Sequence, residues 1–227
     1  ARAVAEHIGA EHYERVITTD DVVREFDSFL VALDQPSVDG VNTYFVSQTA
    51  RQAGLTVALS GLGGDELFGG YPNTFRDVPR VQRALSFAQR VPAGTTAAQI
   101  AIRLLPDRAR WGRFQDALSK PASLASAYLT RRGLFSEAEV KTLVDAETWQ
   151  EASRSFDSAA AVATRASSNA NHDADAFAWV SRAELRNYTH NQLLRDTDVM
   201  SMAHSLEVRA PYRSEEHTSE LQSRQYL

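Results

Sequence analysis

The pattern of apolar and polar positions divides the chain into an amino-terminal part that mixes helices with strands and a longer part that is helical. Residues 55–59 form a short apolar run with the length and β-branched content of a buried parallel strand. In the same part, residues 12–18 predict a second strand, and helical periodicity covers residues 1–9, 20–33 and 41–53. This mixture of helices and strands is typical of an α/β fold.

Beyond Asp77 the strand signals vanish and helical periodicity takes over. The prolines at positions 79, 92, 106 and 121 lie near predicted helix boundaries, because proline interrupts the helical hydrogen-bond pattern. The fold class that follows is α/β, with a parallel-sheet portion ahead of a largely helical region. The predicted helices of that region are residues 78–91, 97–105, 115–118, 122–131, 136–144, 155–166 and 174–204.

A glycine-rich string, SGLGGDELFGGY at residues 60–71, directly follows the predicted strand at residues 55–59. Open α/β sheets bind their ligands at the carboxyl ends of such strands. We expect Gly61, Gly63 and Gly64 to adopt positive φ angles and to bring backbone N–H groups close to a ligand. Because concave arrays of amides bind anions, phosphate is the expected ligand.

Asp65 adds a carboxylate to this string. Residues 65–69 are expected to open a short helix whose first turn has unpaired N–H donors. Beside bound phosphates, Asp65 would be an oxygen ligand for Mg²⁺, which is typically held by one or two carboxylates plus phosphate oxygens. The alternative is a turn of glycines and a helix that Asp65 caps, with nothing bound.

The whole string resembles the second conserved motif of the synthetase domain of glutamine-hydrolysing asparagine synthases, SGxGxDExFGGY, at every fixed position. Residues 193–211 (LLRDTDVMSMAHSLEVRAP) are similar to the family's LLxxxDRxSMAHSLExRxPFLD, and residues 1–14 and 34–45 are also of the kind that it contains. We therefore predict that residues 1–212 are part of one such domain. The matched positions of the second segment are Leu193, Leu194, Asp198, Ser201, Met202, Ala203, His204, Ser205, Leu206, Glu207, Arg209 and Pro211.

The resemblance implies a nucleotide-binding fold of the PP-loop ATPase type, also described as adenine nucleotide alpha hydrolase-like. It implies that AMP passes from ATP to the β-carboxylate of aspartate, that pyrophosphate leaves, and that ammonia attacks the acyl-adenylate to give asparagine, with Mg²⁺ as the metal. In the family, a cysteine of an amino-terminal glutaminase domain releases the ammonia from glutamine. These residues contain no cysteine, so we expect that domain outside them. A homodimer is compatible with the resemblance.

The resemblance also implies roles for the glycine-rich residues. Ser60 and Gly61 are placed at the ATP site, with the amides of Gly63 and Gly64 close by. Asp65 is expected to share Mg²⁺ with an aspartate of the family's SGGxDS motif. No SGGxD string occurs in this sequence, and the family's catalytic lysine follows the second segment, so we expect both outside these residues, on a longer protein.

Leu62 departs from the pattern of well-known asparagine synthases, which often have a glutamate here, at a position tied to formation of the aspartyl-adenylate. A leucine side chain cannot accept a proton. Either another group acts in this branch, or the acceptor is another carboxylate, as in related enzymes that close β-lactam rings, form lasso peptides or amidate polysaccharide sugars. An alternative of another class is a non-catalytic helical scaffold that binds ATP or a partner.

Charged residues of the second segment are candidates for a substrate pocket. A helix over residues 194–206 would place Val199, Met202 and Leu206 on one apolar face, with Asp198 at its edge. Glu207 and Arg209 follow at the exit of the helix, where they either line the pocket or form a structural ion pair. His204 is expected to be a packing or capping residue rather than an acid or base.

Asn42 and Thr43 open the predicted helix that precedes the glycine-rich string, close to Asp34, Ser37 and Asp39. Because this segment leads into the glycine-rich loop, we predict that Asn42 and Thr43 border the pocket for the acceptor carboxylate. Finding them on the side of the sheet remote from Ser60 would contradict the prediction.

Composition narrows the classes of partner. The formal net charge of the 227 residues is −5, without a stripe of lysine and arginine, which argues against nucleic acid as the main ligand. Scattered histidines show no metal-binding spacing. No apolar run approaches the length of a membrane span, so we expect a soluble, cytoplasmic protein with no membrane partner.

Residues 213–227 do not continue the family's pattern. Reverse-translated, residues 213–223 (RSEEHTSELQS) match a common sequencing adapter in frame, so we expect residues 213–227 to be a library artefact without structural meaning. The alternative is a genuine polar tail, which would be disordered. A natural coding sequence through these residues at the source locus would contradict the artefact.

Overall fold

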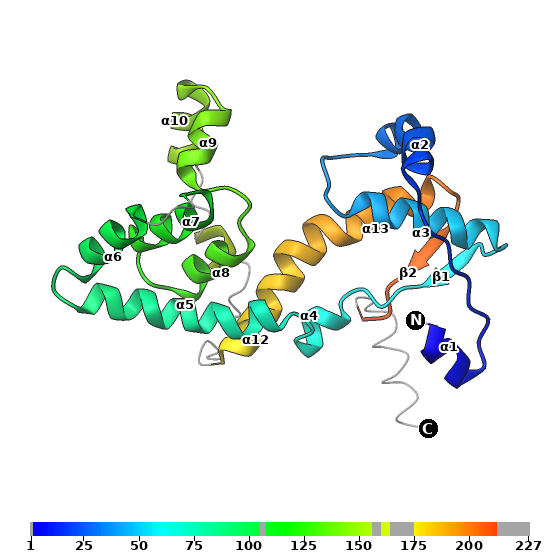
Figure 1. Cartoon of the computed structure of the whole chain (residues 1–227), viewed down its shortest axis with the longest axis horizontal. Helices are drawn as coiled ribbons and strands as arrows, with labels where there is room; N and C mark the ends of the chain where they lie inside the picture. Colours follow the sequence, from blue (N-terminus) through cyan, green and yellow to red (C-terminus); the bar gives the residue numbers. More distant parts are fainter. Residues whose placement is uncertain (1, 105–107, 156–159, 164–174, 213–227) are drawn as a thin grey trace. The chain divides into compact units, whose positions relative to one another are not determined.

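The structure is a computed structural model, and it describes residues 2–104, 108–155, 160–163 and 175–212 (Figure 1). Residues 213–227 and part of the predicted helix at 155–166 lie outside the described residues. The chain forms two compact units, one of Ala1–Gly63 with Thr189–Leu227 and the other of Gly64–Tyr188. The glycine-rich string therefore begins in the first unit and ends in the second.

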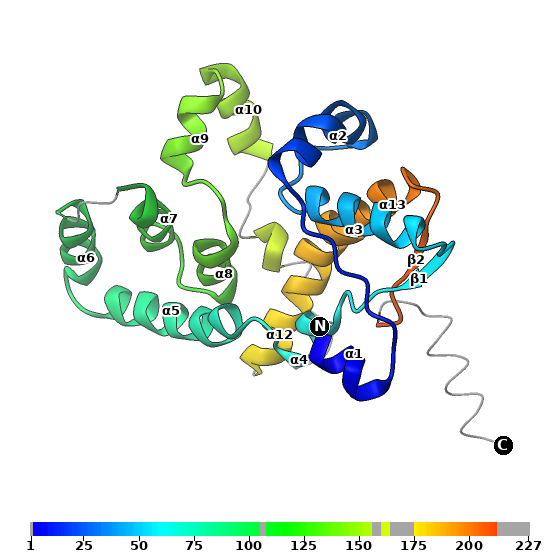
Figure 2. The ribbon, with the colours of Figure 1, turned by 45° about the vertical axis from the view of Figure 1, so that its right-hand side comes forward.

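The first unit contains a short parallel sheet. Strand β1 (Val57–Leu59) pairs with β2 (Glu207–Arg209), and the two lie side by side in Figure 1 and Figure 2. Because the strands are parallel, their carboxyl ends lie at the same edge of the sheet. The helices of this unit are α1 (Arg2–Ile8), α2 (Thr19–Ala32), α3 (Gly40–Gln52) and α13 (Leu194–Met202).

The apolar core of the first unit lies between α3 and α13. Tyr44 and Phe45 of α3 and Met200 of α13 are buried, and Phe29 of α2 packs against them. The rings of Phe29 and Tyr44 meet edge to face with their centroids 5.8 Å apart, a favourable arrangement for aromatic pairs. This cluster fixes α13, and with it the segment that leads into β2, against α3.

Helix α2 begins at a capping box, which confirms the helix predicted for residues 20–33. The Thr18 side chain accepts a hydrogen bond from the N–H of Asp21, and the Asp21 carboxylate accepts one from the N–H of Thr18. The backbone and hydroxyl of Thr18, together with Arg24, hold the pKa of Asp21 well below its usual value. Two otherwise unpaired donors are thus satisfied at the start of α2.

The strand predicted at residues 12–18 is wrong, although this segment is extended. Arg15 and Ile17 are half-buried while Glu14 and Val16 are exposed, so the side chains alternate as they would in a strand. A strand also needs a neighbouring backbone to pair with, and among the described residues the sheet consists of β1 and β2. The periodicity is therefore that of an unpaired extended chain.

The second unit is helical throughout its described residues. Its core has two clusters: Val78 packs with Tyr128 and Trp179 in one, and Leu85 packs with Leu118 in the other. Both Val78 and Leu85 lie on α5, so this helix contributes to both clusters. The helices are α4 (Gly64–Phe68), α5 (Pro72–Arg90), α6 (Gly94–Arg103), α7 (Arg108–Leu118), α8 (Leu124–Arg132), α9 (Glu137–Leu143), α10 (Ala146–Ser155) and α12 (Ala176–Ala183).

Pro79 lies inside α5 and not near a boundary, so its predicted position is wrong. The helix begins earlier, at Pro72, where proline is tolerated because the first turn has no intrahelical acceptor for its missing N–H. An interior proline costs one hydrogen bond and favours a kink. Val78 and Leu85 are fully buried on either side of it, and their packing outweighs this cost.

The long helix predicted at residues 174–204 is present as three consecutive segments. α12 is followed by η1 (Glu184–Leu193), whose turns are of the wider π type, and then by α13, which ends at Met202. The strand β2 that follows was not predicted, because no strand signal was found beyond Asp77. Its three residues, Glu207–Arg209, are too few to show a period of their own.

Candidate functional site

The two motifs meet at the carboxyl edge of the sheet. The N–H of Ser60, the first residue of the glycine-rich string, donates to the carbonyl oxygen of Arg209 at 2.8 Å. At the amino end of the sheet, the N–H of Glu207 donates to the carbonyl oxygen of Thr56 at 2.9 Å. Ser60 and Arg209, 149 positions apart in sequence, are thus joined through their backbones at the edge where parallel sheets bind ligands.

The glycine-rich string leaves the sheet through a tight turn. The N–H of Leu62 donates to the Ser60 hydroxyl oxygen at 3.3 Å, and Gly63 is buried with φ at +90°. That φ value requires glycine. Gly61 and Gly64 do not have positive φ angles, so this part of the prediction is wrong. Gly61 is exposed, and a Cβ atom there would meet nothing within 4 Å.

Asp65 lies in the first turn of α4, which begins at Gly64, and its side chain is exposed. Its carboxylate folds back over Gly70, where an added Cβ atom would overlap the carboxylate and lie 2.6 Å from Asp65 Cγ. The N–H of Gly70 donates to the Asp65 carbonyl at 2.8 Å and closes this turn. Glycine at position 70 therefore allows the observed orientation of the Asp65 side chain.

Glu207 and Arg209 occupy alternate positions of β2 and pair with each other. Arg209 Nε donates to Glu207 Oε1 at 2.8 Å, and both side chains are more than half exposed. An exposed pair of this kind contributes little to stability. Arg209 pairs with Leu59 at the carboxyl end of the sheet, next to Ser60, whereas Glu207 pairs with Val57 at the amino end. Asp198 is exposed on α13, and its backbone carbonyl accepts a hydrogen bond from the Ser201 hydroxyl.

The apolar face predicted for the second motif is only partly present. Val199 packs into the core and Leu206 is buried, but Met202 is exposed and Met200 is fully buried in its place. The helix ends at Met202, and Ser205 has φ at +53°, so Leu206 does not continue the helical register. This turn directs Leu206 into the core just before β2.

His204 packs against Tyr44, with ring centroids 4.3 Å apart. Burial lowers the pKa of His204, and the Glu25 carboxylate only partly opposes that shift. Its Nε2 atom is buried, and among the described residues it has no hydrogen-bond partner. A neutral, packed imidazole is the state that these surroundings favour, in line with the packing role expected from the sequence.

The segment ahead of α3 is held by polar contacts with η1 and α13. The Ser37 hydroxyl donates to Asp196 Oδ2 at 2.5 Å and accepts hydrogen bonds from the N–H groups of Asp39 and Gly40. Asp196 is 2% exposed. The first turn of α3 follows, with Asn42 exposed and Thr43 half-buried. That these two residues border the acceptor pocket stays a prediction. Further contacts are Arg195 with Asp34, Gln192 with Asp39, and Gln35 with the carbonyl of Asn191.

Replacing Ser37 by Ala is expected to lower the free energy of unfolding by about 1.5–3 kcal/mol near pH 7, because a buried carboxylate loses a hydrogen bond. Burial raises the pKa of Asp196, and the Ser37 hydroxyl opposes that rise. A pKa raised by folding means that stability falls as the pH rises through the folded-state pKa. Without Ser37 the folded-state pKa of Asp196 is raised further and the total fall is larger, so the cost of S37A should shrink as the pH is lowered.

Denaturant unfolding at pH values from about 4 to 7 checks this expectation, since that range spans the ordinary carboxyl pKa and neutrality. The matched control is the Asp196→Asn background, in which S37A should have a cost that does not depend on pH. An equal cost of S37A at all pH values in the natural background would contradict the role of Asp196.

A family comparison identifies what these motifs belong to. The model of the family described as asparagine synthase matches residues 1–216. The chain belongs to the asparagine synthase family. Its two motifs, joined at the edge of the β1–β2 sheet, therefore belong to one asparagine synthase domain.

Curated relatives carry the same family name. Asparagine synthetase (glutamine-hydrolyzing) 1 of Bacillus subtilis is 28% identical over 219 residues, which cover 93% of this chain and 32% of the relative. The human asparagine synthetase (glutamine-hydrolyzing) is 31% identical over 96 residues, 40% of this chain and 17% of that protein. The chain thus spans about a third of the length of the Bacillus relative. No solved structure matches it.

This asparagine synthase domain contains a buried polar cluster that the sequence pattern did not predict. Glu66, next to Asp65, is 1% exposed and accepts a long hydrogen bond of 3.5 Å from the Tyr71 hydroxyl. Burial raises the pKa of Tyr71 to about 12, with the Glu66 carboxylate as the next cause. Arg132 and Glu184, in the helices α8 and η1, complete the cluster with a two-pronged ion pair. The sequence offered one signal, the glutamate and tyrosine inside the glycine-rich string.

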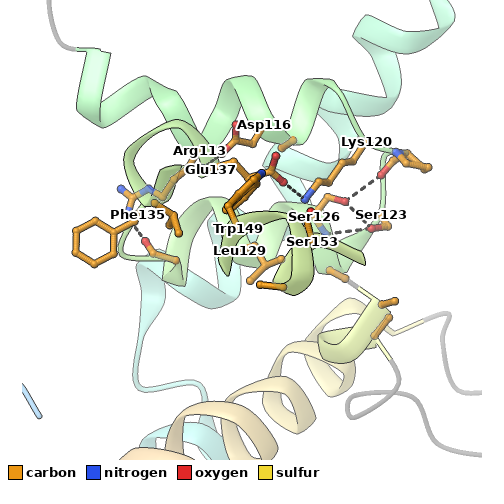
Figure 3. Close-up of a pocket in the computed structure, with 18 of the residues that line it drawn as sticks. Arg113, Asp116, Lys120, Ser123, Ser126, Leu129, Phe135, Glu137, Trp149 and Ser153 are labelled. Atoms are coloured by element: carbon orange, nitrogen blue, oxygen red, sulfur yellow. Dashed lines mark hydrogen bonds and ion pairs between the residues drawn. The ribbon is translucent and has the colours of Figure 1, made fainter. Parts of the chain in front are cut away.

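The helical unit also contains a cavity of about 900 Å³, lined by α7 to α10 and by Ala160 and Ala163 (Figure 3). Trp149 and Leu129 contribute apolar surface, and Lys120 is paired with Glu137 at 2.5 Å. None of the lining residues belongs to either motif of the asparagine synthase domain. The volume suits a small molecule, but the residues do not connect it with the motif chemistry.

Two features are absent from the part of the chain that the structure describes. Within that part, no group of three or more histidine or acidic side chains is placed to hold a metal ion. None of the described helices combines the length and apolar character needed to cross a bilayer. That Asp65 is a ligand of Mg²⁺ stays a prediction.

Proposed function

We propose that this chain is part of an enzyme that adenylates the β-carboxylate of aspartate with ATP and joins it to ammonia from glutamine, giving asparagine, AMP and pyrophosphate. The observation that carries the proposal is the hydrogen bond from Ser60 N to the carbonyl oxygen of Arg209, which joins the two motifs at the carboxyl edge of the sheet. Family membership and the relatives' printed names, asparagine synthetases that hydrolyse glutamine, support the same reaction. The parallel pair β1–β2 supports a fold of the PP-loop ATPase type.

The residues after β1 fit a nucleoside triphosphate. Gly61 is exposed on an open turn, and the Ser60 hydroxyl holds the N–H of Leu62 in that turn. Without side chains in the way, phosphate oxygens can approach the backbone closely. We infer that Ser60, Gly61, Gly63 and Gly64 bind ATP. The string is continuous in sequence, and its next residue, Asp65, is the proposed ligand of Mg²⁺, together with a group outside these residues.

The reaction makes two demands on the protein. A carboxylate oxygen of aspartate forms a bond to the α-phosphorus of ATP while the bond to pyrophosphate breaks, and ammonia then bonds to the acyl carbon as AMP leaves. The chain's residues must orient the two substrates and exclude water. Mg²⁺, when bound, neutralises the charge that develops on the departing pyrophosphate.

The acceptor pocket is proposed to include Glu207 and Arg209 of β2, with Asn42, Thr43 and Asp198. The guanidinium of Arg209 is suited to bind a carboxylate group of the substrate aspartate. Leu62 is half-buried and takes no proton, so the proton released when ammonia attacks must pass to another group. The proposed partners are a glutaminase domain that supplies ammonia and a second copy of the chain.

The deciding experiment is ATP–pyrophosphate exchange by the full-length protein that carries these residues. We expect exchange that depends on both aspartate and Mg²⁺, because adenylation is reversible before ammonia is added. Exchange with another carboxylate, such as a β-amino acid or a uronic acid, and none with aspartate would overturn the proposed acceptor. Absence of exchange with every carboxylate, despite measurable ATP binding, would favour a scaffold that binds nucleotide without catalysis.

A further inference from the structure

The glycine-rich string ends in a stack of side chains inside the helical unit. The guanidinium carbon of Arg132 lies 5.0 Å from the centre of the Tyr71 ring and 4.4 Å from the centre of the Tyr188 ring. Distances below about 6 Å place a cation over an aromatic face at an attractive separation. Tyr71, the last residue of the string, is thus held by a side chain 61 positions further along the chain.

Glu184 fixes the orientation of that guanidinium. Its carboxylate is 0% exposed and accepts hydrogen bonds from Arg132 Nε at 2.8 Å and from Arg132 Nη2. Tyr128 is also hydrogen-bonded to Glu184, and burial raises the pKa of Tyr128, followed by the charge of Glu184. Because this Arg132–Glu184 contact is bidentate, it sets the plane of the guanidinium as well as its position.

From Tyr71 the contacts lead back to the start of α4. The Tyr71 hydroxyl donates to Glu66, a buried side chain adjacent to Asp65. At the other end of the short helix, the N–H of Gly70 donates to the Asp65 carbonyl at 2.8 Å. α4 has only five residues, too few to be stable on its own, so tertiary contacts such as these, together with its packing against α12, hold it in place.

We propose that Arg132 is a positioning residue that holds α4, and therefore Asp65, in place through Tyr71 and Glu66, with Glu184 as its buried anchor. This inference rests on the proposed function in so far as Asp65 is taken to ligate Mg²⁺. Arg132 has defined partners within the helical unit, because Glu184 accepts hydrogen bonds from two of its donors and two tyrosine rings flank its charge. Lysine cannot replace it, because an ammonium group is not planar: it can neither make a bidentate contact with the Glu184 carboxylate nor stack on the tyrosine rings.

The test compares Arg132→Lys with the natural full-length protein. Lysine keeps the positive charge beside Glu184 but loses the plane that orients Tyr71. The Mg²⁺ concentration for half-maximal aspartate-dependent exchange should rise roughly tenfold, in the range seen when groups behind a metal ligand are altered. Hydrogen exchange of the peptide over residues 64–71 should quicken to a similar extent, while peptides from α5 remain unchanged.

The matched control is Arg131→Lys, at the neighbouring position, where the arginine is 40% exposed and pairs with Asp77 at 3.4 Å. It should change neither the Mg²⁺ dependence nor the exchange of residues 64–71. A second variant, Tyr71→Phe, keeps the ring over Arg132 but removes the bond to Glu66, and it should quicken the same peptide.

The outcomes separate this inference from the proposed function. If R132K leaves the exchange of residues 64–71 as slow as in the natural protein, Arg132 does not position α4. If the peptide quickens but the Mg²⁺ dependence stays unchanged, Asp65 is not positioned for the metal by this contact, and the inference is also overturned. If the natural protein has no aspartate-dependent activity, the proposed function fails. Hydrogen exchange, which needs no substrate, still decides whether Arg132 holds α4.

Discussion

Aspartate-dependent ATP–pyrophosphate exchange by the full-length protein is expected to fall on the order of 10²–10³-fold when Asp65 is replaced by Asn, a loss typical of removing one preorganised group that stabilises transition-state charge. The substitution removes the charge of the proposed Mg²⁺ ligand and keeps its shape. The Asp65 side chain is exposed, so the folded structure should not depend on its ionisation. Thermal unfolding should therefore be nearly unchanged while exchange is lost.

Asp27→Asn is the matched control, since Asp27 is also an exposed helical aspartate, on α2. It should leave exchange unchanged. Gly70→Ala provides a companion variant that keeps the Asp65 carboxylate but displaces it, because the new methyl group would occupy its position. If G70A acts through Asp65, the double variant D65N/G70A should be no worse than D65N alone. Additive losses would place the effect of Gly70 elsewhere, and full activity of D65N would remove Asp65 from the site.

The sequence allowed the glycine-rich turn and several helices to be predicted because their determinants are local. A helix at residues 20–33 follows from its period and from the capping residues Thr18 and Asp21, which lie within four positions of each other. The positive φ of Gly63 and the helix starting at Gly64 likewise depend on neighbouring residues. Ser60 does follow a strand, as predicted, but β1 has only three residues, pairs with the distant β2, and is largely exposed rather than buried.

What could not be predicted depends on partners far along the chain. β2 has three residues, and only its pairing with β1 makes it a strand. Residues 12–18 are the opposite case. Their pattern is typical of a strand, but among the described residues no backbone pairs with them. Arg132 and Glu184 each look like a solvent-facing charge on a helix, and their burial arises from a contact across 52 positions. Met200, not Met202, is buried because α13 ends before the predicted apolar face is complete.

Replacing Arg132 by Met is expected to destabilise the helical unit by about 3–5 kcal/mol, because Glu184 would remain as an uncompensated buried charge. Adding Glu184→Gln removes that charge and leaves an acceptor for Tyr128, so the double variant should regain roughly half of the loss or more. Thermal or denaturant unfolding of the full-length protein, followed by a signal from the helical unit, measures both. Arg131→Met, which removes an exposed partner of Asp77, is the control and should cost about 1 kcal/mol or less.

The double variant R132M/E184Q separates the two proposed effects of Arg132, which are to stabilise the helical unit and to position α4. Glutamine and methionine together relieve the buried charge, yet neither places a planar cation over Tyr71. R132M/E184Q should therefore recover stability without recovering the natural Mg²⁺ dependence of exchange. If the two recover together, the ion pair acts on α4 only by keeping the unit folded. If stability does not return, the loss in R132M comes from the packing of the arginine stem and rings rather than from the unpaired charge of Glu184.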